Sequence, residues 1–296
     1  MSETVAVVRA SRPNFLVLAP LCAGLGVAVA WHQGEPPALL NTLLVLIGAL
    51  LAHAAVNLLN EYEDFASGLD LITRRTPFSG GSGALPEVPT AARQVLLAAF
   101  GTLGLVVAIG LYFLWLRGLP MLVLGAAGVV LVLTYTRWIT RSPVICLLAP
   151  GLGFGPVMIL GSLIALGARL DATALTVSTI GLLLVSELLR INQIPDADAD
   201  RKVGRRHLVI TLGKTAAARL VGLLLLGSYG ILEAAIWIGW LPLWTALAFA
   251  PLPAAIWISV KLPGALNRPE QFNTLLGINV GVLLATLALL ICGLSL

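Results

Sequence analysis

The sequence predicts an all-α, polytopic membrane protein with nine transmembrane helices around a central cavity and a cytoplasmic N-terminus. Three observations support this prediction. Of the 296 residues, 58% are hydrophobic and only 11% are charged, whereas soluble domains carry roughly 25% charged residues. The apolar residues form long runs, and most of the basic residues lie in alternate connections between these runs. The composition indicates a membrane-embedded fold, and the other two observations give its topology.

Nine apolar runs are long enough to cross a bilayer, which takes about 20 mostly apolar residues per helix. The predicted spans are 14–31, 38–60, 92–116, 119–136, 144–166, 172–193, 214–239, 242–260 and 271–294. The first run has no convincing small-residue cleavage site, so we expect a retained span and not a signal peptide. Arg117 and Gly118 separate the third run from the fourth, and Lys214 marks the start of the seventh. Pro150 and Gly155 in the fifth run are compatible with a membrane helix.

The basic residues decide the orientation of these spans. If the N-terminus is cytoplasmic, every lysine and arginine except Arg117 and Arg169 falls in a cytoplasmic loop or helix end. This bias follows the positive-inside rule and explains the net charge of +4 without a nucleic-acid partner. Nine spans then put the C-terminus outside and both acidic stretches inside. We therefore expect a multi-pass protein of the inner (cytoplasmic) membrane, embedded in the lipid bilayer, with a site that faces the cytoplasm.

The chain is predicted to form one membrane domain, 1–296, made of two pseudo-repeats, 14–136 and 144–260, and a ninth span, 271–294. In each repeat a span ends in a run of residues that begins with asparagine and ends with aspartate, and a long polar loop follows. The two cytoplasmic loops, 61–91 and 194–213, are longer than the other connections. Because long loops between packed elements are often functional, both are candidate parts of a binding site.

Carboxylate and carboxamide side chains share a helix face in both acidic stretches. The first trio is Asn57, either Asn60 or Glu61, and Asp64, spaced i, i+3 or i+4, and i+7. The second trio, Asn192, Asp196 and Asp200, is spaced i, i+4 and i+8. Such residues at the end of a membrane span are costly and are functional candidates. One polar helix end is ordinary, but two matched trios on one side indicate a shared ligand. Their oxygen atoms suit Mg²⁺, which commonly binds substrate phosphates as well.

Cations and aromatic residues near these trios are candidate substrate contacts. The cations are Arg74, Arg75, Arg137, Arg190, Arg201 and Lys202, and the aromatic residues are Tyr62 and Tyr135. The cations could contact diphosphate oxygens, and Tyr135 could place a phenol at the same cytoplasmic level. Alternatively, each cation could set topology or pair with a neighbouring aspartate, and the tyrosine at the end of the fourth span could belong to an interfacial aromatic belt. The glycine-rich segment 79–83 could approach a phosphate or act as a hinge. We expect His53 to satisfy a local hydrogen bond and not to act as a catalyst.

These motifs resemble those of the UbiA superfamily of intramembrane prenyltransferases. The segment Asn60-Glu61-Tyr62-Glu63-Asp64 is similar to the family signature Asn-Asp-x-x-Asp, except that Glu61 stands where most relatives have aspartate. The continuation Gly68-x-Asp70 and the second stretch, 192–201, resemble the branch that prenylates 1,4-dihydroxy-2-naphthoate in menaquinone biosynthesis. The resemblance covers almost the whole chain.

The resemblance implies Mg²⁺-dependent transfer of a polyprenyl group from polyprenyl diphosphate to a small aromatic acceptor, with 1,4-dihydroxy-2-naphthoate as the expected acceptor. It also implies nine spans and two cytoplasmic Asp-rich loops. The residues that would hold Mg²⁺ and support catalysis are Asn60, Asp64, Asp196 and Asp200, with Asn57 and Asn192 supporting the substrate.

Two other interpretations remain open from the sequence. The first is an enzyme of the same family with another acceptor, such as a hydroxybenzoate, a tetrapyrrole or a carotenoid, since the acidic motifs concern only the diphosphate. The second is a cation-coupled transporter, because intramembrane carboxylates and a pseudo-repeat are also typical of that class. A transporter, however, should place its charges near the bilayer midplane, whereas these stretches lie at one membrane surface.

Overall fold

The computed structural model describes residues 1–34 and 36–296, and every regular element in this part of the chain is helical. The elements that form the long helical stretches, singly or end to end, are α2 (Leu18–His32), α3 (Leu39–Ala66), α6 (Ala92–Arg117), α7 (Leu119–Thr134), α8 (Pro143–Leu152), η4 (Gly153–Leu160), α9 (Gly161–Leu166), α10 (Ala172–Lys202), α12 (Lys214–Ile238), η5 (Leu243–Phe249), α13 (Leu252–Ala265) and α14 (Pro269–Ser295). The short ones are α1 (Glu3–Ala10), η1 (Pro13–Phe15), α4 (Leu69–Ile72), α5 (Ala84–Glu87), η2 (Pro89–Ala91), η3 (Ile139–Arg141) and α11 (Leu208–Leu212).

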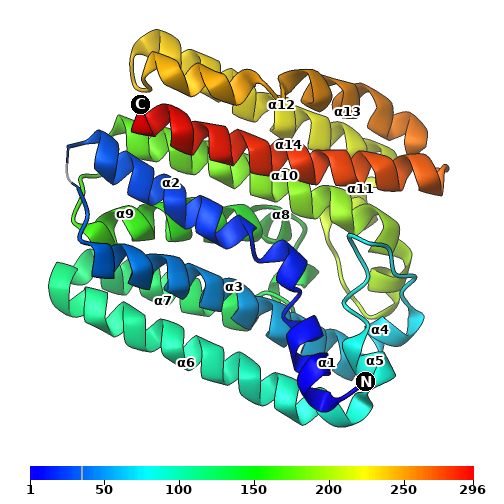
Figure 1. The fold of residues 1–296 in the computed structure, drawn as a ribbon. Helices are drawn as coiled ribbons and strands as arrows, with labels where there is room; N and C mark the ends of the chain where they lie inside the picture. Colours follow the sequence, from blue (N-terminus) through cyan, green and yellow to red (C-terminus); the bar gives the residue numbers. More distant parts are fainter. Residues whose placement is uncertain (35) are drawn as a thin grey trace.

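The long helices run side by side as a bundle, and the short helices gather at one end of it (Figure 1). The N-terminus lies at that end beside α5, and the C-terminus lies at the opposite end. Both acidic stretches also reach that end, because α3 and α10 finish there. The fold therefore brings the two stretches to the same end of the bundle.

Seven helical stretches of the described chain are long and apolar enough to cross a membrane, and the bent pair Glu3–Phe15 and Leu18–His32 would make an eighth. The one remaining predicted span, 119–136, corresponds to α7, which has 16 residues. At 1.5 Å per residue it is about 24 Å long, less than the roughly 30 Å hydrocarbon core. The prediction of an all-α multi-pass membrane protein is confirmed, since many large apolar side chains, such as Trp115 and Trp237, face outward.

The two helices that carry the acidic stretches are longer than the sequence predicted. The second predicted span ends at 60, but α3 continues to Ala66, and the sixth ends at 193, but α10 continues to Lys202. The predicted loops 61–91 and 194–213 therefore begin as helix. Pro195 lies inside α10 and does not end it, as is common in membrane helices, where neighbouring groups can satisfy the carbonyl that proline leaves free. Both polar trios consequently lie on continuous helices.

Glycines let α10 pack closely against the helix that runs from α8 into η4. A Cβ atom at Gly151 would lie 2.4 Å from the Leu182 carbonyl oxygen, and one at Gly155 would lie 2.6 Å from the Ser178 carbonyl oxygen. Only glycine permits this approach. The η4 segment, which includes Gly155, is π-helical, a conformation found frequently at functional sites.

Candidate active site

The ends of α3 and α10 face one another across a small polar pocket. Its carboxylates are Asp64 from α3, Asp70 from α4, and Asp196 and Asp200 from α10. The pocket has a volume of about 130 Å³, and Asn60, Asn192 and Arg205 also line it. The structure therefore brings together the four residues predicted to bind metal, together with Asn192.

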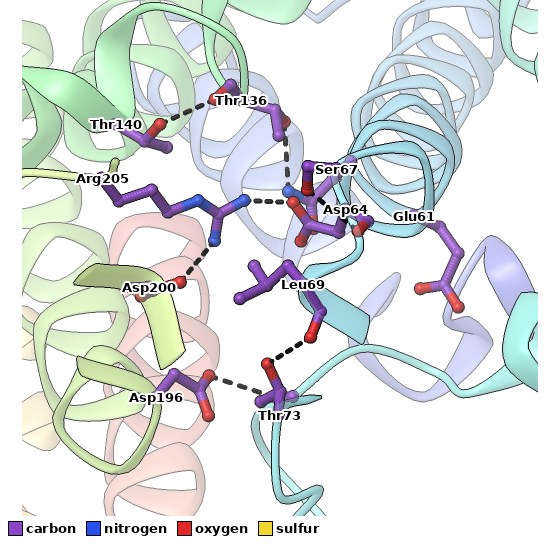
Figure 2. Close-up of polar contacts among 12 residues, drawn as sticks. Glu61, Asp64, Ser67, Leu69, Thr73, Thr136, Thr140, Asp196, Asp200 and Arg205 are labelled. Atoms are coloured by element: carbon purple, nitrogen blue, oxygen red, sulfur yellow. Dashed lines mark hydrogen bonds and ion pairs between the residues drawn. The ribbon is translucent and has the colours of Figure 1, made fainter. Parts of the chain in front are cut away.

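Arg205 joins the two acidic helices through its guanidinium group (Figure 2). Its Nη2 forms an ion pair with Asp64, and its Nη1 donates to Asp200 Oδ1 at 2.9 Å. The second oxygen of Asp200 lies 2.8 Å from His207 Nε2. Burial opposes the charge of Arg205, but the two aspartates outweigh this effect and hold the pKa of Arg205 above its usual range. Arg205 thus supplies a fixed positive charge between the two helices.

The glycine-rich loop reaches the same pocket from the other side. The Gly80 amide donates to Asp196 Oδ2 at 3.1 Å. Gly80 and Gly81 have φ values of 81° and 76°, which glycine adopts far more readily than other residues. A Cβ atom at Gly81 would also lie 2.8 Å from Asp70 Oδ1. The loop therefore requires glycine in order to close over the carboxylates.

Several oxygen atoms in the pocket are available to a cation. Asp70 Oδ2, Asn192 Oδ1 and Asp196 Oδ1 are buried, and none has a hydrogen-bond partner among the described residues. Burial, together with the nearby Glu61 and Asp64 carboxylates, raises the pKa of Asp70 to about 7. Buried oxygens without partners are costly, and these are the ligands that Mg²⁺ prefers. The donor set therefore fits a magnesium ion.

These carboxylates are not drawn together as a ready-formed metal centre. No group of three His, Cys, Asp or Glu side chains in residues 1–34 and 36–296 has the spacing of a metal site. Arg205 explains part of this, because its guanidinium lies between Asp64 and Asp200 (Figure 2). A cation held by the same Asp64 and Asp200 oxygens that pair with Arg205 would require Arg205 to exchange at least one of its two partners.

Glu61 faces away from this cluster (Figure 2) and has a different set of partners. Its carboxylate accepts from Arg12 Nη2 at 3.1 Å, from the Ser82 amide at 3.0 Å and from the Ser82 hydroxyl. Arg12 also donates to Asn60 Oδ1 at 3.0 Å, and its backbone has φ 53°, which is unusual for arginine. Glu61 therefore anchors the N-terminal segment and the glycine-rich loop.

A larger, apolar cavity of about 740 Å³ adjoins the polar pocket. It lies between α3, α6, α7 and the helix from α8 through α9. The residues that line both the cavity and the pocket, which we call the shared wall, are Arg12, Asn60, Phe78, Tyr135, Leu189 and Asn192. A molecule with a polar head and a long apolar tail could therefore occupy both spaces at once.

Some predicted substrate contacts lie at these cavities and others do not. Asn57 lines the apolar cavity and donates to the Ser11 carbonyl at 3.0 Å. The residues that line neither cavity are Tyr62, Arg74, Arg75, Arg137, Arg190, Arg201 and Lys202. Tyr62 packs in an apolar cluster with α1 and α6, and Arg75 pairs with Glu87 at 3.6 Å. These placements give Tyr62 and Arg75 structural partners in the protein itself.

Arg137, Arg201 and Lys202 are exposed, and Arg190 is not. The Arg137 guanidinium lies 5.9 Å from the Trp138 ring centroid. The Arg190 side chain is fully buried and donates from Nη1 to Gln193 Oε1 at 2.8 Å. Gln193 lines the polar pocket, so Arg190 contacts a residue of the pocket without reaching it.

Sequence reasoning counted Arg12 only among the topology-setting cations. It named Arg205 as one of several cations after Asp200 that could contact a diphosphate, but it did not predict that Arg205 joins Asp64 to Asp200. Arg12 acts across 48 residues of sequence on Asn60, and Arg205 acts across 141 residues on Asp64. Contacts at such separations depend on the folded bundle.

Comparisons with known proteins agree with this geometry. The profile described as "UbiA prenyltransferase family" matches residues 17–279. The 1,4-dihydroxy-2-naphthoate octaprenyltransferase of Escherichia coli (strain K12) is 31% identical over 239 residues, which cover 77% of this chain and 75% of that protein. The enzyme of the same name from Bacillus subtilis (strain 168) is 24% identical over 289 residues, or 93% of this chain and 91% of that protein.

Solved structures share the fold at lower sequence identity. A UbiA homologue from Archaeoglobus fulgidus bound to DMAPP and Mg²⁺ has a TM-score of 0.64 and 18% identity, over 96% of this chain and 98% of that one. A UbiA homologue from Aeropyrum pernix K1 has a TM-score of 0.69 and 18% identity, over 91% of this chain and 95% of that one. At this identity the likeness concerns the fold.

Proposed function

Because the chain belongs to the UbiA prenyltransferase family, we propose that it transfers a polyprenyl group from its diphosphate to a hydroxylated aromatic acid at the shared wall. The observation that carries this proposal is the joining of a polar, carboxylate-rich pocket to an apolar cavity. A polyprenyl diphosphate has this same division between a charged head and an apolar tail. Keeping that tail out of water is worth about 0.8 kcal/mol for each buried CH₂ group.

We propose 1,4-dihydroxy-2-naphthoate as the acceptor. Both bacterial relatives described above carry this acceptor in their names, and one of them aligns over 93% of this chain. We further propose that the pocket faces the cytoplasm at the cytoplasmic membrane. All lysines and arginines except Arg117 and Arg169 then obey the positive-inside rule.

Mg²⁺ is the proposed cofactor, held by Asn60, Asp64, Asp196 and Asp200 with help from Asn192 and Asp70. The available oxygens of Asp196, Asn192 and Asp70 support this assignment, as does the Mg²⁺ bound by the homologue from Archaeoglobus fulgidus. When bound, the metal neutralises charge that develops on the departing diphosphate. Arg205 and Arg12 line the pocket and can donate to diphosphate oxygens that carboxylates would repel.

The shared wall provides a dry place for the reaction. The allylic C–O bond breaks with its electron pair leaving on the diphosphate, and a ring carbon of the acceptor forms the new C–C bond. Tyr135 and Phe78 line both spaces, so their ring faces can stabilise positive charge on the allylic carbon. The apolar cavity keeps water from capturing that carbon. The ring regains aromaticity by losing carbon dioxide or a proton.

Purified protein tests this proposal directly. Incubation with geranylgeranyl diphosphate, 1,4-dihydroxy-2-naphthoate and Mg²⁺ is expected to give a prenylated naphthalene by mass spectrometry, and EDTA is expected to stop its formation. A parallel incubation with 4-hydroxybenzoate tests the acceptor. Product only from hydroxybenzoate would overturn the acceptor assignment, and no product from either would overturn the proposed reaction.

A further inference from the structure

His53 places an imidazole ring in the largely apolar cavity. It lies on the α3 face that also carries Asn57 and Asn60, and all three residues line the cavity. It precedes them by four and seven residues, which corresponds to about 6 Å and about 10 Å along the helix axis. His53 therefore lies on the tail side of the polar pocket, within reach of a molecule that spans the shared wall.

The protein itself does not satisfy this ring. His53 is only 7% exposed, and its Nδ1 has no hydrogen-bond partner among the described residues. Its packing partner is Phe154, an apolar ring that meets it edge-on with a centroid separation of 4.9 Å. The sequence-based expectation of a local hydrogen bond is therefore not met at Nδ1. A buried polar atom without a partner costs free energy, and such atoms are rare enough in native proteins to require an explanation.

Phe154 comes from the π-helical segment η4, which packs against α10 through the closely fitting glycines described above. The ring of His53 is thus positioned between α3 and a helix whose geometry departs from the α-helical pattern. π-helical segments appear frequently at functional sites. The surroundings of His53 and the missing hydrogen-bond partner of its Nδ1 therefore both point to a ligand.

We propose that His53 hydrogen-bonds a ring hydroxyl of the aromatic acceptor and thereby orients the acceptor for attack. This inference rests on the proposed function and deepens it. A polyprenyl tail has no group that can pair with an imidazole, and the diphosphate belongs to the carboxylate pocket. Of the two substrates, only the acceptor brings a hydroxyl group to this depth. The acceptor must also lie on the cavity side of the diphosphate, where His53 is.

This contact gives the site a way to select acceptors. A site that hydrogen-bonds a substrate hydroxyl discriminates strongly against the analogue that lacks it, because the site's polar group is then left without a partner. Removing the imidazole should abolish that discrimination. His53 is thus a specificity-determining residue that contacts substrate, and its effect is confined to the acceptor.

The test compares kinetics with 1,4-dihydroxy-2-naphthoate and with its two analogues that lack one ring hydroxyl. In the unaltered enzyme, one analogue is expected to show a kcat/KM at least about tenfold below that of the full acceptor. His53→Phe is expected to lower kcat/KM for the full acceptor by about tenfold or more. The kcat/KM for the disfavoured analogue should stay nearly unchanged. The KM for geranylgeranyl diphosphate should stay the same. His53→Asn or His53→Gln, which place an amide near Nδ1 or Nε2, should restore part of the discrimination.

Leu50→Phe is the matched control, because Leu50 lies one turn away on the exposed face of α3. It should leave acceptor discrimination unaltered. A binding measurement on the unaltered protein does not depend on the folding of any variant. With ¹⁵N-labelled histidine, the chain has three imidazole rings to follow, each with two ring nitrogens. Addition of the acceptor should shift the His53 signal, and the analogue lacking the paired hydroxyl should not.

Suppose that the unaltered enzyme prenylates the naphthoate. The inference is then overturned if His53→Phe keeps full acceptor discrimination, or if it lowers kcat/KM for the full acceptor and for both analogues by the same factor. An unmoved His53 signal on acceptor binding also overturns it. By contrast, an unaltered enzyme that makes no prenylated product from any acceptor contradicts the proposed function itself. The two failures are therefore distinguishable.

Discussion

At the scale of single residues, Asp196 and Asp198 lie about half a turn apart on α10, so that one faces the pocket and the other faces solvent. Asp196 accepts from the Gly80 amide and keeps its buried Oδ1 available. The side chain of Asp198 is 73% exposed and pairs with Lys214 at 2.8 Å. Two carboxylates of the same stretch thus have opposite surroundings.

Replacement of Asp196 by asparagine is therefore expected to impair catalysis without unfolding the protein. The new carboxamide would keep an oxygen for the Gly80 amide but would lack the charge that holds a cation. We expect Asp196→Asn to lower Mg²⁺-dependent kcat/KM by about 100-fold or more with little change in thermal stability. Asp198→Asn, the control, should retain turnover close to that of the unaltered enzyme. Normal turnover by Asp196→Asn would remove this residue from the site.

The sequence predicted Asp64, Asp196 and Asp200 because helical spacing places each on a polar face, and the structure brings them to one pocket. It could not predict the partners of Glu61, which depend on Arg12 and Ser82 at the start of the chain and in the loop. Nor could it predict that Arg201 and Lys202 face solvent, while Arg205, a few residues further on, forms ion pairs with Asp64 and Asp200. Beyond the end of α10, helical spacing no longer says which way a side chain points.

At the scale of helices, a buried polar pair joins α10 to α14. Asn279 Nδ2 donates to both oxygens of Glu187, at 3.0 and 3.1 Å, and both residues have no exposed surface. An unpaired carboxyl group in a membrane helix is costly. The contact therefore fixes one face of α10, and with it the direction in which Asp196 and Asp200 point.

Asn279→Leu is expected to leave Glu187 without its partner and to lower the free energy of unfolding by about 1–3 kcal/mol. Denaturant titration of the detergent-solubilised protein, followed by tryptophan fluorescence, measures this change. Glu187→Gln preserves an amide contact with Asn279 and should be less destabilising. Equal stability of Asn279→Leu and the unaltered protein would show that the pair contributes little to the packing of α10 against α14.

Hydropathy predicted the first residues of the long helices more closely than it predicted the last residues of α3 and α10, the two helices that carry the acidic stretches. The apolar runs end near 60 and 193, so a hydropathy argument stops there, whereas α3 and α10 continue to Ala66 and Lys202. The i, i+4, i+8 spacing in the second trio already contained the helical signal. Pro195 obscured it, because proline usually indicates the end of a helix outside a membrane.

At the scale of the whole molecule, the apolar cavity and the polar pocket lie next to one another and have the shared wall in common. The sequence predicted a central cavity but not its size, since volume depends on how side chains from α3, α6, α7 and η4 pack together. Family resemblance supplied the expectation of a prenyl substrate, and the shared wall supports it with a physical arrangement. The cavity also suggests how donor length is limited.

Ala49→Phe is expected to shorten the preferred donor, because Ala49 lines the cavity and is 7% exposed. A phenyl ring there removes space that the far end of a long tail would use. The ratio of kcat/KM for geranyl diphosphate to that for geranylgeranyl diphosphate should rise by about tenfold. Leu50→Phe adds the same ring on the exposed face of α3 and should leave the ratio unchanged. An unchanged ratio in Ala49→Phe would place the tail elsewhere.

Arg205 also affects how the charged diphosphate group of a substrate could enter the largely buried polar pocket. Asp64 and Asp200 already share a resident counter-ion in that guanidinium. In the proposed reaction, the carboxylates would hold the metal and Arg205 would donate to the phosphate oxygens. Substrate binding would then be an exchange of ion-pair partners that keeps the interior close to electroneutral.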